Sequence, residues 1–278
     1  MLKGLFGKKA TAKTQSNEPS RESRLIEAFL GCECEYIPAN TDPDEVLRRF
    51  DVTEMFCRNN GMCPVLVAVD DILAEAFFEN AGIGLPEQGS IPQGDIERIK
   101  KYRSELIASY SPANAEALIL SGEQRTSELL KDRQFKKIFW DSEVIEFDDN
   151  NKCMDAFRDL QTKKTRELLL AKIPVSEPWQ VAAWFPMGGW NGCPSPEDML
   201  AMAKRWYQKY GAVICCVTYD EMEFHVANLP STREEALALA KEHFYFCEDR
   251  LTQYGGYYNL ATLVDGLLRS RYWYFWWD

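Results

Sequence analysis

The chain has 278 residues, of which 46% are apolar, and its formal net charge is −11. This length fits one or two domains with a large core, and the acidic balance excludes a surface built to bind nucleic acid or an anionic membrane. The sequence has no apolar run near the roughly 20 residues of a membrane span, and no signal peptide. With nine cysteines, an odd number, these features predict a reduced, cytoplasmic protein.

The first part of the chain predicts a tail followed by an N-terminal α/β unit. Residues 1–20 are polar and are expected to be disordered, and residues 21–174 form the unit. Apolar residues at helical spacing, together with caps and glycine stops, predict helices over 22–30, 42–59, 70–78, 95–110, 123–133 and 153–171, with a short one starting at 111. Strands are predicted over 34–37, 64–69, 135–140 and 144–147, with a turn over 148–151.

The second part, residues 175–278, predicts a C-terminal domain with clearer boundaries. Ser195 followed by Pro196 marks a helix start, and Gly211 marks its end. Further helices are predicted over 232–247 and 260–268, and strands over 179–185, 212–218, 222–226 and 272–277. The order of strands and helices indicates a mixed α/β fold, with a mixed sheet flanked by helices.

The two parts have a similar order of elements. Strand, loop, acidic helix and apolar strand occur over 34–71 and again over 180–220, which favours two related strand–helix–strand units. The sequence leaves open whether the two parts share one sheet or form separate domains.

The loop over 184–194 is the first candidate binding site, because it combines tryptophan with glycine, proline and asparagine. Such a mixture suits neither a helix nor a strand and is costly to order. Loops at strand ends are where sheet folds place their sites. The candidate binding residues are Trp184, Met187, Gly188, Gly189, Trp190, Asn191, Glu223, Trp276 and Asp278, and we expect Trp190, Asn191, Glu223, His225, Trp276 and Asp278 to share one cleft.

Cys193 and His225 are the candidate catalytic pair. Cys193 precedes a helix N-terminus, whose dipole can lower the pKa of a thiol, and His225 lies on the polar face of a nearby strand. Asn191 or Glu223 could orient the histidine, as in thiol-dependent acyl transfer. The competing interpretation is a small thiol packed in a loop of glycine and proline. His243, the other histidine, is expected in the core.

No metal or cofactor is predicted. Cys32 and Cys34, like Cys57 and Cys63, lack paired zinc-ligand spacing and a nearby histidine. No glycine-rich segment continues into the Lys-Ser/Thr of a phosphate loop.

The terminal run 272–277 predicts a strand that is aromatic on both faces. Trp273, Phe275 and Trp277 would face one way, and Tyr272, Tyr274 and Trp276 the other. We expect a core strand, with the second face available to stack on Trp190 or to bind a partner.

Several unusual motifs occur together in the C-terminal part. They are Gly188-Gly189-Trp190-Asn191, Cys193-Pro194, Trp206-Tyr207, Glu223-Phe224 and the terminal Tyr272-Trp273-Tyr274-Phe275-Trp276-Trp277-Asp278. On these residues the chain resembles the bacterial domain-of-unknown-function family 4253, over about residues 179–278, and Pro64–Val69 with Asp70-Asp71 is similar to the upstream part of longer members. The resemblance implies a cytoplasmic bacterial protein and no particular activity.

We therefore expect a binding or protein-interaction module without catalysis, and an immunity-like role would suit the acidic charge. Two other functions stay open: a thiol-dependent hydrolase or transferase using Cys193 with His225, and a small-ligand pocket lined by tryptophan. An inert Cys193 would favour the binding module, and contact between Cys193 and a histidine in an open pocket would favour the enzyme. The sequence does not determine the partner or the oligomeric state.

Overall fold

A computed structural model describes residues 18–86, 90–145, 153–253 and 258–278. The α-helices are α1 (Arg21–Leu30), α2 (Pro43–Asn59), α3 (Asp71–Asn80), α4 (Gln93–Ala108), α5 (Pro112–Leu129), α6 (Arg133–Phe135), α7 (Pro196–Tyr210), α8 (Arg233–Phe246), α9 (Asp249–Thr252) and α10 (Leu260–Leu267). A π-helix, η1, spans Lys136–Trp140, and a 3₁₀ helix, η2, spans Pro178–Trp184. The strands are β1 (Cys34–Ile37), β2 (Met62–Ala68), β3 (Leu168–Pro174), β4 (Val213–Val217), β5 (Glu221–His225) and β6 (Tyr272–Trp276).

The six strands form one mixed sheet, in the order β1-β3-β2-β4-β5-β6. The β2–β4 pair is parallel, and every other neighbouring pair in this sheet is antiparallel, so β1, β2, β4 and β6 run in one direction. The predicted mixed α/β sheet is therefore confirmed. The sheet also joins both parts of the chain, because β3 lies between β1 and β2 and the early strand β2 lies beside β4.

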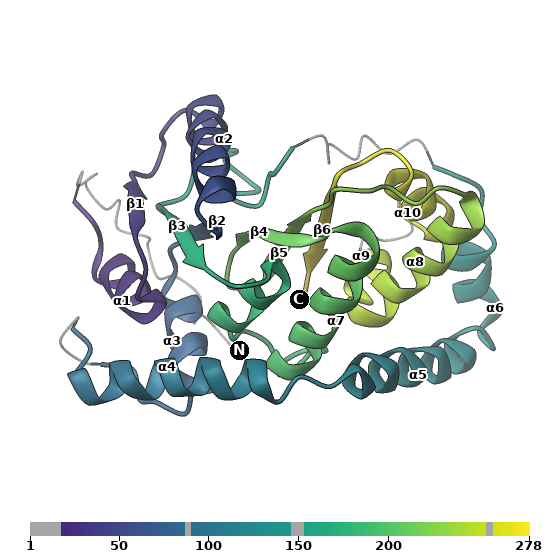
Figure 1. Ribbon diagram of the computed structural model, residues 1–278. Helices are drawn as coiled ribbons and strands as arrows, with labels where there is room; N and C mark the ends of the chain where they lie inside the picture. The colour runs from purple at the N-terminus through teal and green to yellow at the C-terminus, as the bar shows by residue number, and fades with distance from the viewer. Residues whose placement is uncertain (1–17, 87–89, 146–152, 254–257) are drawn as a thin grey trace, which may run out of the picture.

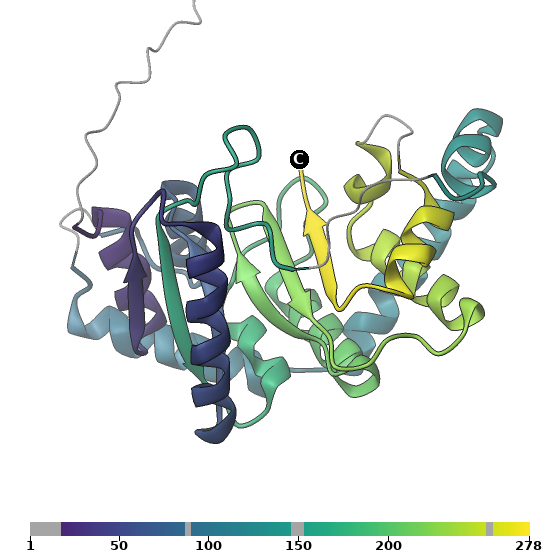
Figure 2. The same cartoon turned by 90° about the horizontal axis from the view of Figure 1, so that it is seen from above.

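Helices cover both faces of the sheet (Figure 1). On one face, α2 packs on β2 and β3, and residues 153–167 add Met154, Ala156 and Phe157 to this smaller core. The opposite face carries the larger core, to which α1, α3, α4, η2, α7, α8 and α10 contribute. Figures 1 and 2 both show α8 and α10 grouped beyond the edge strand β6.

The helix ends that were predicted from capping residues and glycine stops agree with the structure. The side chains of Asp42, Ser195 and Thr232 cap α2, α7 and α8 by accepting backbone N–H groups. Gly31 and Gly211 end α1 and α7 with φ of 62° each, in the left-handed region.

The prediction of a strand over 179–185 is wrong, because this segment is the 3₁₀ helix η2. Glu177 and Gln180 form a capping box around Pro178, which fixes a helical start. The apolar residues of η2 are buried because the helix packs against α7, α4 and β4. The second strand–helix–strand unit consequently lacks its first strand, and α7 lies on the opposite face of the sheet from α2.

The helix predicted over 153–171 is also wrong. Residues 153–167 have no regular helix or strand, and Leu168–Pro174 forms β3. Leu168, Leu169, Leu170 and Ala171 are all buried because β3 lies between two strands and is covered on both faces. A fully buried strand has a continuous apolar run, which periodicity alone does not distinguish from a helix.

The strand predicted over 135–140 is helical, and residues 112–129 form one helix where two were expected. Asp132 caps α6 by accepting the backbone N–H groups of Gln134 and Phe135. Gly122 lies inside α5, and glycine is required there because Tyr245 packs directly on its backbone, where a Cβ atom would lie 2.4 Å from the tyrosine Cβ. Val144, at the start of the strand predicted over 144–147, is outside regular structure. The end of that predicted strand and the turn predicted over 148–151 lie outside the described residues, as do residues 1–17 of the predicted tail.

The terminal aromatic run forms the predicted core strand. Trp273, Phe275 and Trp277 are at most 1% exposed, and Tyr272, Tyr274 and Trp276 on the other face are half-buried. Trp206 of α7 packs on this strand, with its ring centroid 5.4 Å from that of Phe275 and 5.7 Å from that of Trp273. These aromatic contacts join α7 to the edge of the sheet.

Candidate binding site

A pocket of about 400 Å³ opens at the edge of the sheet where the parallel strands β2, β4 and β6 end. It is lined by Ile72, Glu75, Ala76, Glu79, Trp190, Asn191, Tyr219, Asp220, Trp277 and Asp278. The carboxyl ends of parallel strands are the usual place for a ligand site in an α/β sheet, because the loops that follow the strands converge there.

One wall of the pocket is a face of α3. Asp70 follows β2 directly and caps α3 by accepting the backbone N–H of Ile72. Ile72, Glu75, Ala76 and Glu79 recur at helical spacing and all line the pocket. Ile72 is 53% exposed, so it adds an apolar side chain to this wall of the pocket.

A second wall is built around the Asp220 turn between β4 and β5. The Asp220 carboxylate accepts the indole N–H of Trp276 at 3.0 Å and the hydroxyl of Thr218 at 2.9 Å. Its backbone carbonyl accepts the N–H of Trp277 at 3.0 Å. Asp220 thus ties the end of β6 to the end of β4, and this places Trp277 and Asp278 in the pocket wall.

The loop over 184–194 supplies the third wall. Its backbone enters the left-handed region at Gly188, Gly189, Asn191 and Gly192, with φ of 99°, 79°, 40° and 78°. The N–H of Gly189 bonds to the carbonyl of Cys193 at 3.1 Å, and the N–H of Cys193 bonds to that of Trp190 at 2.7 Å. The loop is therefore a closed turn that presents Trp190 and Asn191 to the pocket.

The base of this loop is anchored in the core. Met187 is fully buried, and the Asn80 side-chain amide donates to the carbonyl of Pro186 at 2.8 Å. Trp184 lies below the guanidinium of Arg103, with 4.5 Å between the guanidinium carbon and the ring centroid. Trp184 and Met187 therefore support the loop and do not line the pocket.

The chemistry of the pocket is acidic and aromatic. Four of its lining residues carry carboxylates, three have aromatic rings, and none of the described lining residues is basic. Carboxylates attract a cation, and the faces of tryptophan and tyrosine attract it further. The same carboxylates repel phosphate and carboxylate ligands.

Of the residues predicted to share one cleft, the structure brings Trp190, Asn191 and Asp278 together in this pocket, and it holds Trp276 behind the pocket through Asp220. Glu75, Glu79, Tyr219 and Trp277 also line the pocket, but they were not among the residues predicted from the sequence. The α3 residues had a usable signal, because two glutamates at i and i+4 share an exposed face of a helix that starts at a strand end. Tyr219 and Asp220 lie in the short connection between two predicted strands, and the sequence there gives no sign of a site.

Cys193 does not lie beside His225. Cys193 is 5% exposed and belongs to the larger core. The prediction that the helix dipole lowers the pKa of its thiol is wrong, because burial raises this pKa. The charges of Cys247 and Asp249 act in the same direction, and the Cys247 thiol donates to the carbonyl of Trp276 at the end of β6. His225 instead pairs with Tyr272, at the start of β6, so the two residues lie at opposite ends of that strand.

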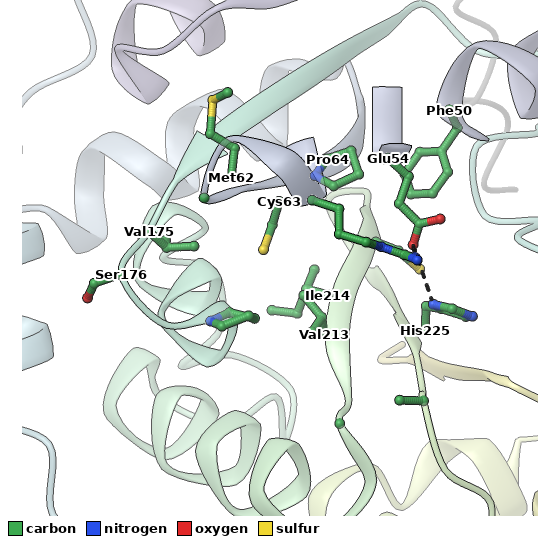
Figure 3. A pocket seen from close by; sticks show the side chains of 16 residues that line it. Phe50, Glu54, Met62, Cys63, Pro64, Val175, Ser176, Val213, Ile214 and His225 are labelled. Carbon is green, nitrogen blue, oxygen red and sulfur yellow. Dashed lines mark ion pairs between the residues drawn. The ribbon is translucent and has the colours of Figure 1, made fainter. Parts of the chain in front are cut away.

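His225 lies in a second pocket, of about 340 Å³, at the amino ends of β2 and β4 (Figure 3). Its Nδ1 lies 3.9 Å from the Glu54 carboxylate, and Arg58 lies 3.5 Å from the same carboxylate. Burial lowers the pKa of His225 although Glu54 opposes this shift. The Glu54 carboxylate thus lies between Arg58 and His225, and the other lining residues are mostly apolar. His243 is buried among Trp206, Trp273 and Phe275, as expected of a core histidine.

Glu223 lies in the smaller core and not in the predicted cleft. It is 1% exposed, and its carboxylate accepts the backbone N–H groups of Asp155 and Ala156 at 3.0 to 3.2 Å. Glu221, two residues earlier on the same face of β5, accepts the Tyr274 hydroxyl at 2.7 Å and pairs with Arg166 at 3.2 Å. The two carboxyl groups fasten residues 153–167 to the sheet.

Stability should fall as pH rises because of these two groups. Burial raises the pKa of Glu221 to about 7 and that of Glu223 to about 8, from 4.5. Between pH 4.5 and these values the folded state keeps protons that the unfolded state releases, so the free energy of unfolding declines by up to about 1.4 kcal/mol per pH unit for each group. Urea unfolding of the wild type and Glu223→Gln from pH 5 to 8 measures this slope.

In the Glu223→Gln variant, the free energy of unfolding should no longer decline with pH in the range up to about pH 8 that Glu223 accounts for. Its amide oxygen can still accept the two N–H groups, so the fold is retained. Glu97→Gln, at an exposed position, should keep the wild-type slope. An unchanged slope in Glu223→Gln would contradict the assignment.

The described residues include no cluster of three or more side chains suited to hold a metal ion. All nine cysteines are free thiols. Among the helices of the described ranges, none has the length and apolar character required to traverse a bilayer.

The C-terminal part of the chain has a recognised family. Residues 169–278 match the sequence model of DUF4253, which is described as a domain of unknown function, and this confirms the resemblance in the C-terminal part. The match contains β4, β5, β6 and all but the first residue of β3, and it includes both the 184–194 loop and the terminal aromatic strand. Neither a curated protein nor a solved structure gives a match.

Proposed function

We propose that this chain, whose residues 169–278 are a DUF4253 domain, is a non-catalytic binding protein that receives a cationic side chain of a protein partner. The occupied site would be the pocket at the carboxyl edge of β2, β4 and β6. The observation that carries the proposal is the composition of that pocket, which combines four carboxylate-bearing residues with Trp190, Tyr219 and Trp277.

An arginine side chain fits this composition best. Its planar guanidinium can stack on an aromatic face while it donates hydrogen bonds to carboxylates at its edge. Trp190 is half-buried and offers such a face, and Glu75 and Glu79 are exposed on the facing helix. The net charge of −11 would guide a basic partner towards the protein.

Two further features support a binding role. The thiol of Cys193 is buried, as expected of a packed residue and not of a nucleophile. The nine free thiols suit a reducing compartment, so we place the protein in the bacterial cytoplasm.

Calorimetric titration with an acetylated hexa-arginine peptide tests the proposal. The double variant Glu75→Gln/Glu79→Gln should bind this peptide about tenfold more weakly than the wild type, because two ion pairs at a partly exposed site are lost. Trp190→Leu should also weaken binding, by about fivefold, through loss of the cation–π contact.

The matched control is Glu97→Gln/Glu105→Gln on α4, which makes the same change in net charge at two exposed positions away from the pocket. It should bind like the wild type. Equal weakening in both double variants would mean that only overall charge attracts the peptide, and the proposal would then be abandoned. Absence of binding to the wild type would have the same consequence.

A further inference from the structure

Cys32 and Cys34 form a pair of thiols at the edge of the sheet, away from the acidic pocket. The chain leaves α1 through Gly31, passes Cys32, and enters the edge strand β1 at Cys34. Both cysteines are half-buried, and the Cys34 thiol lies 3.7 Å from the carbonyl oxygen of Cys32.

A buried guanidinium lies beside this pair. Arg103 is 7% exposed and donates to the carbonyls of Phe29 and Leu30, at 2.9 and 3.2 Å, which places its charge at the C-terminal end of α1. The hydrogen bond from Cys34 lowers the pKa of the Cys32 thiol, and Arg103 and the backbone N–H of Lys172 lower it further, against burial and the charge of Glu27. The same hydrogen bond and burial raise the pKa of Cys34.

This arrangement separates the pair from the other cysteines of the chain. Burial raises the pKa of the thiols of Cys57, Cys63, Cys193, Cys215, Cys216 and Cys247, and all six side chains are buried. Cys153 is half-buried like the pair but has neither a neighbouring cysteine in sequence nor a place in the α1–β1 connection. A reactive thiol requires both a stabilised thiolate and access, and Cys32 combines a lowered pKa with a side chain that is only partly buried.

We propose that Cys32 and Cys34 are a redox-active dithiol, which reduces a low-molecular-weight disulfide and closes into a Cys32–Cys34 disulfide. The Cys32 thiolate attacks one sulfur of that disulfide, the disulfide bond breaks, and one thiolate leaves. Cys34 then loses its proton to solvent, and its sulfur attacks the Cys32 sulfur of the mixed disulfide and expels the second thiolate. The pair loses two electrons, and the small disulfide gains them as it becomes two thiols.

The Cys32–Cys34 disulfide would join two residues that are close in sequence, and it would be strained. Only Glu33 separates the two cysteines, and its carbonyl accepts the N–H of Lys172 at 2.9 Å from β3. A disulfide ring this small departs from relaxed geometry, and strained disulfides are easily reduced again. The site therefore suits reversible oxidation and not a permanent crosslink.

Oxidation by glutathione disulfide, followed by alkylation and peptide mapping of the full chain, tests the proposal. The peptide containing both cysteines should carry no alkyl group and should weigh about 2 Da less than the unalkylated reduced peptide, by the mass of two hydrogens. Treatment with dithiothreitol before alkylation should instead give the doubly alkylated peptide. With reduced protein and limiting iodoacetamide, Cys32 should be alkylated faster than any other cysteine.

Serine variants identify the two roles. Cys34→Ser should stop at the mixed disulfide on Cys32, and Cys32→Ser should greatly slow any reaction at Cys34. The control Cys153→Ser should behave like the wild type. Three results with the wild-type protein would overturn the proposal. They are a reaction that stops at the glutathione adduct, a disulfide between Cys32 and Cys57, and a first reaction at another cysteine.

Discussion

Gly188→Ala should unfold the protein at much lower denaturant concentration than the wild type. Gly188 has φ of 99°, and a Cβ atom there would lie 1.9 Å from the carbonyl oxygen of Pro194. That oxygen belongs to the backbone at the closed end of the 184–194 loop, so it cannot rotate away as a side chain could. We expect a loss of about 3 kcal/mol or more in the free energy of unfolding, measured by urea titration.

Gly189→Ala is the matched control for this prediction. Gly189 also has a positive φ, of 79°, but a Cβ atom there has no neighbour within 4 Å among the described residues. Its cost should be only about 1 kcal/mol, from backbone conformation alone. Equal losses in the two variants would show that the contact with Pro194 does not matter. In Gly188→Ala, any folded protein should also bind the arginine peptide weakly, since Trp190 depends on this loop.

The C-terminal part should not fold by itself, although it contains the whole DUF4253 match. In the sheet, β2 lies between β3 and β4, so a fragment of residues 168–278 lacks the strand that joins its own two. Val65, Leu66, Val67 and Ala68 of β2 are fully buried, and their removal exposes the neighbouring core. Because burial of a valine or leucine side chain contributes about 1.5–3 kcal/mol, this loss is comparable to the whole net stability of about 5–15 kcal/mol of a typical domain.

The isolated fragment should therefore show no cooperative urea transition and no near-ultraviolet circular dichroism from its tryptophans. Addition of a fragment of residues 1–167, which supplies β2 and α2, should restore both signals if the two fragments refold together. A fragment 168–278 that unfolds cooperatively on its own would contradict the prediction. It would show that β3 and β4 can form a domain without β2.

The loop and the terminal strand show how much of the site the sequence predicted. The glycines between Trp184 and Pro194 indicated a costly backbone, and four residues of that loop do have positive φ. The alternation correctly grouped Trp273, Phe275 and Trp277 on one face of β6, and the structure shows that this is the buried face. The prediction that Glu223 lies in the cleft was wrong. The alternation of apolar and polar residues in β5 shows which face of the strand Glu223 is on, but it does not show what covers that face. Residues 153–167, which cover that face and supply the two N–H groups to its carboxylate, are distant in the sequence.

The sequence by itself determined what depends on a few neighbouring residues. Caps at Asp42 and Ser195, stops at Gly31 and Gly211, and the α/β class all follow from local hydrogen bonding and backbone freedom. Tertiary structure decided whether short apolar runs became strand or helix, as in β3 and η2, because burial on all sides removes the periodicity that distinguishes them. It also decided the site, since Glu75, Trp190 and Asp220 meet only when β2 and β4 pair in parallel and their following loops converge.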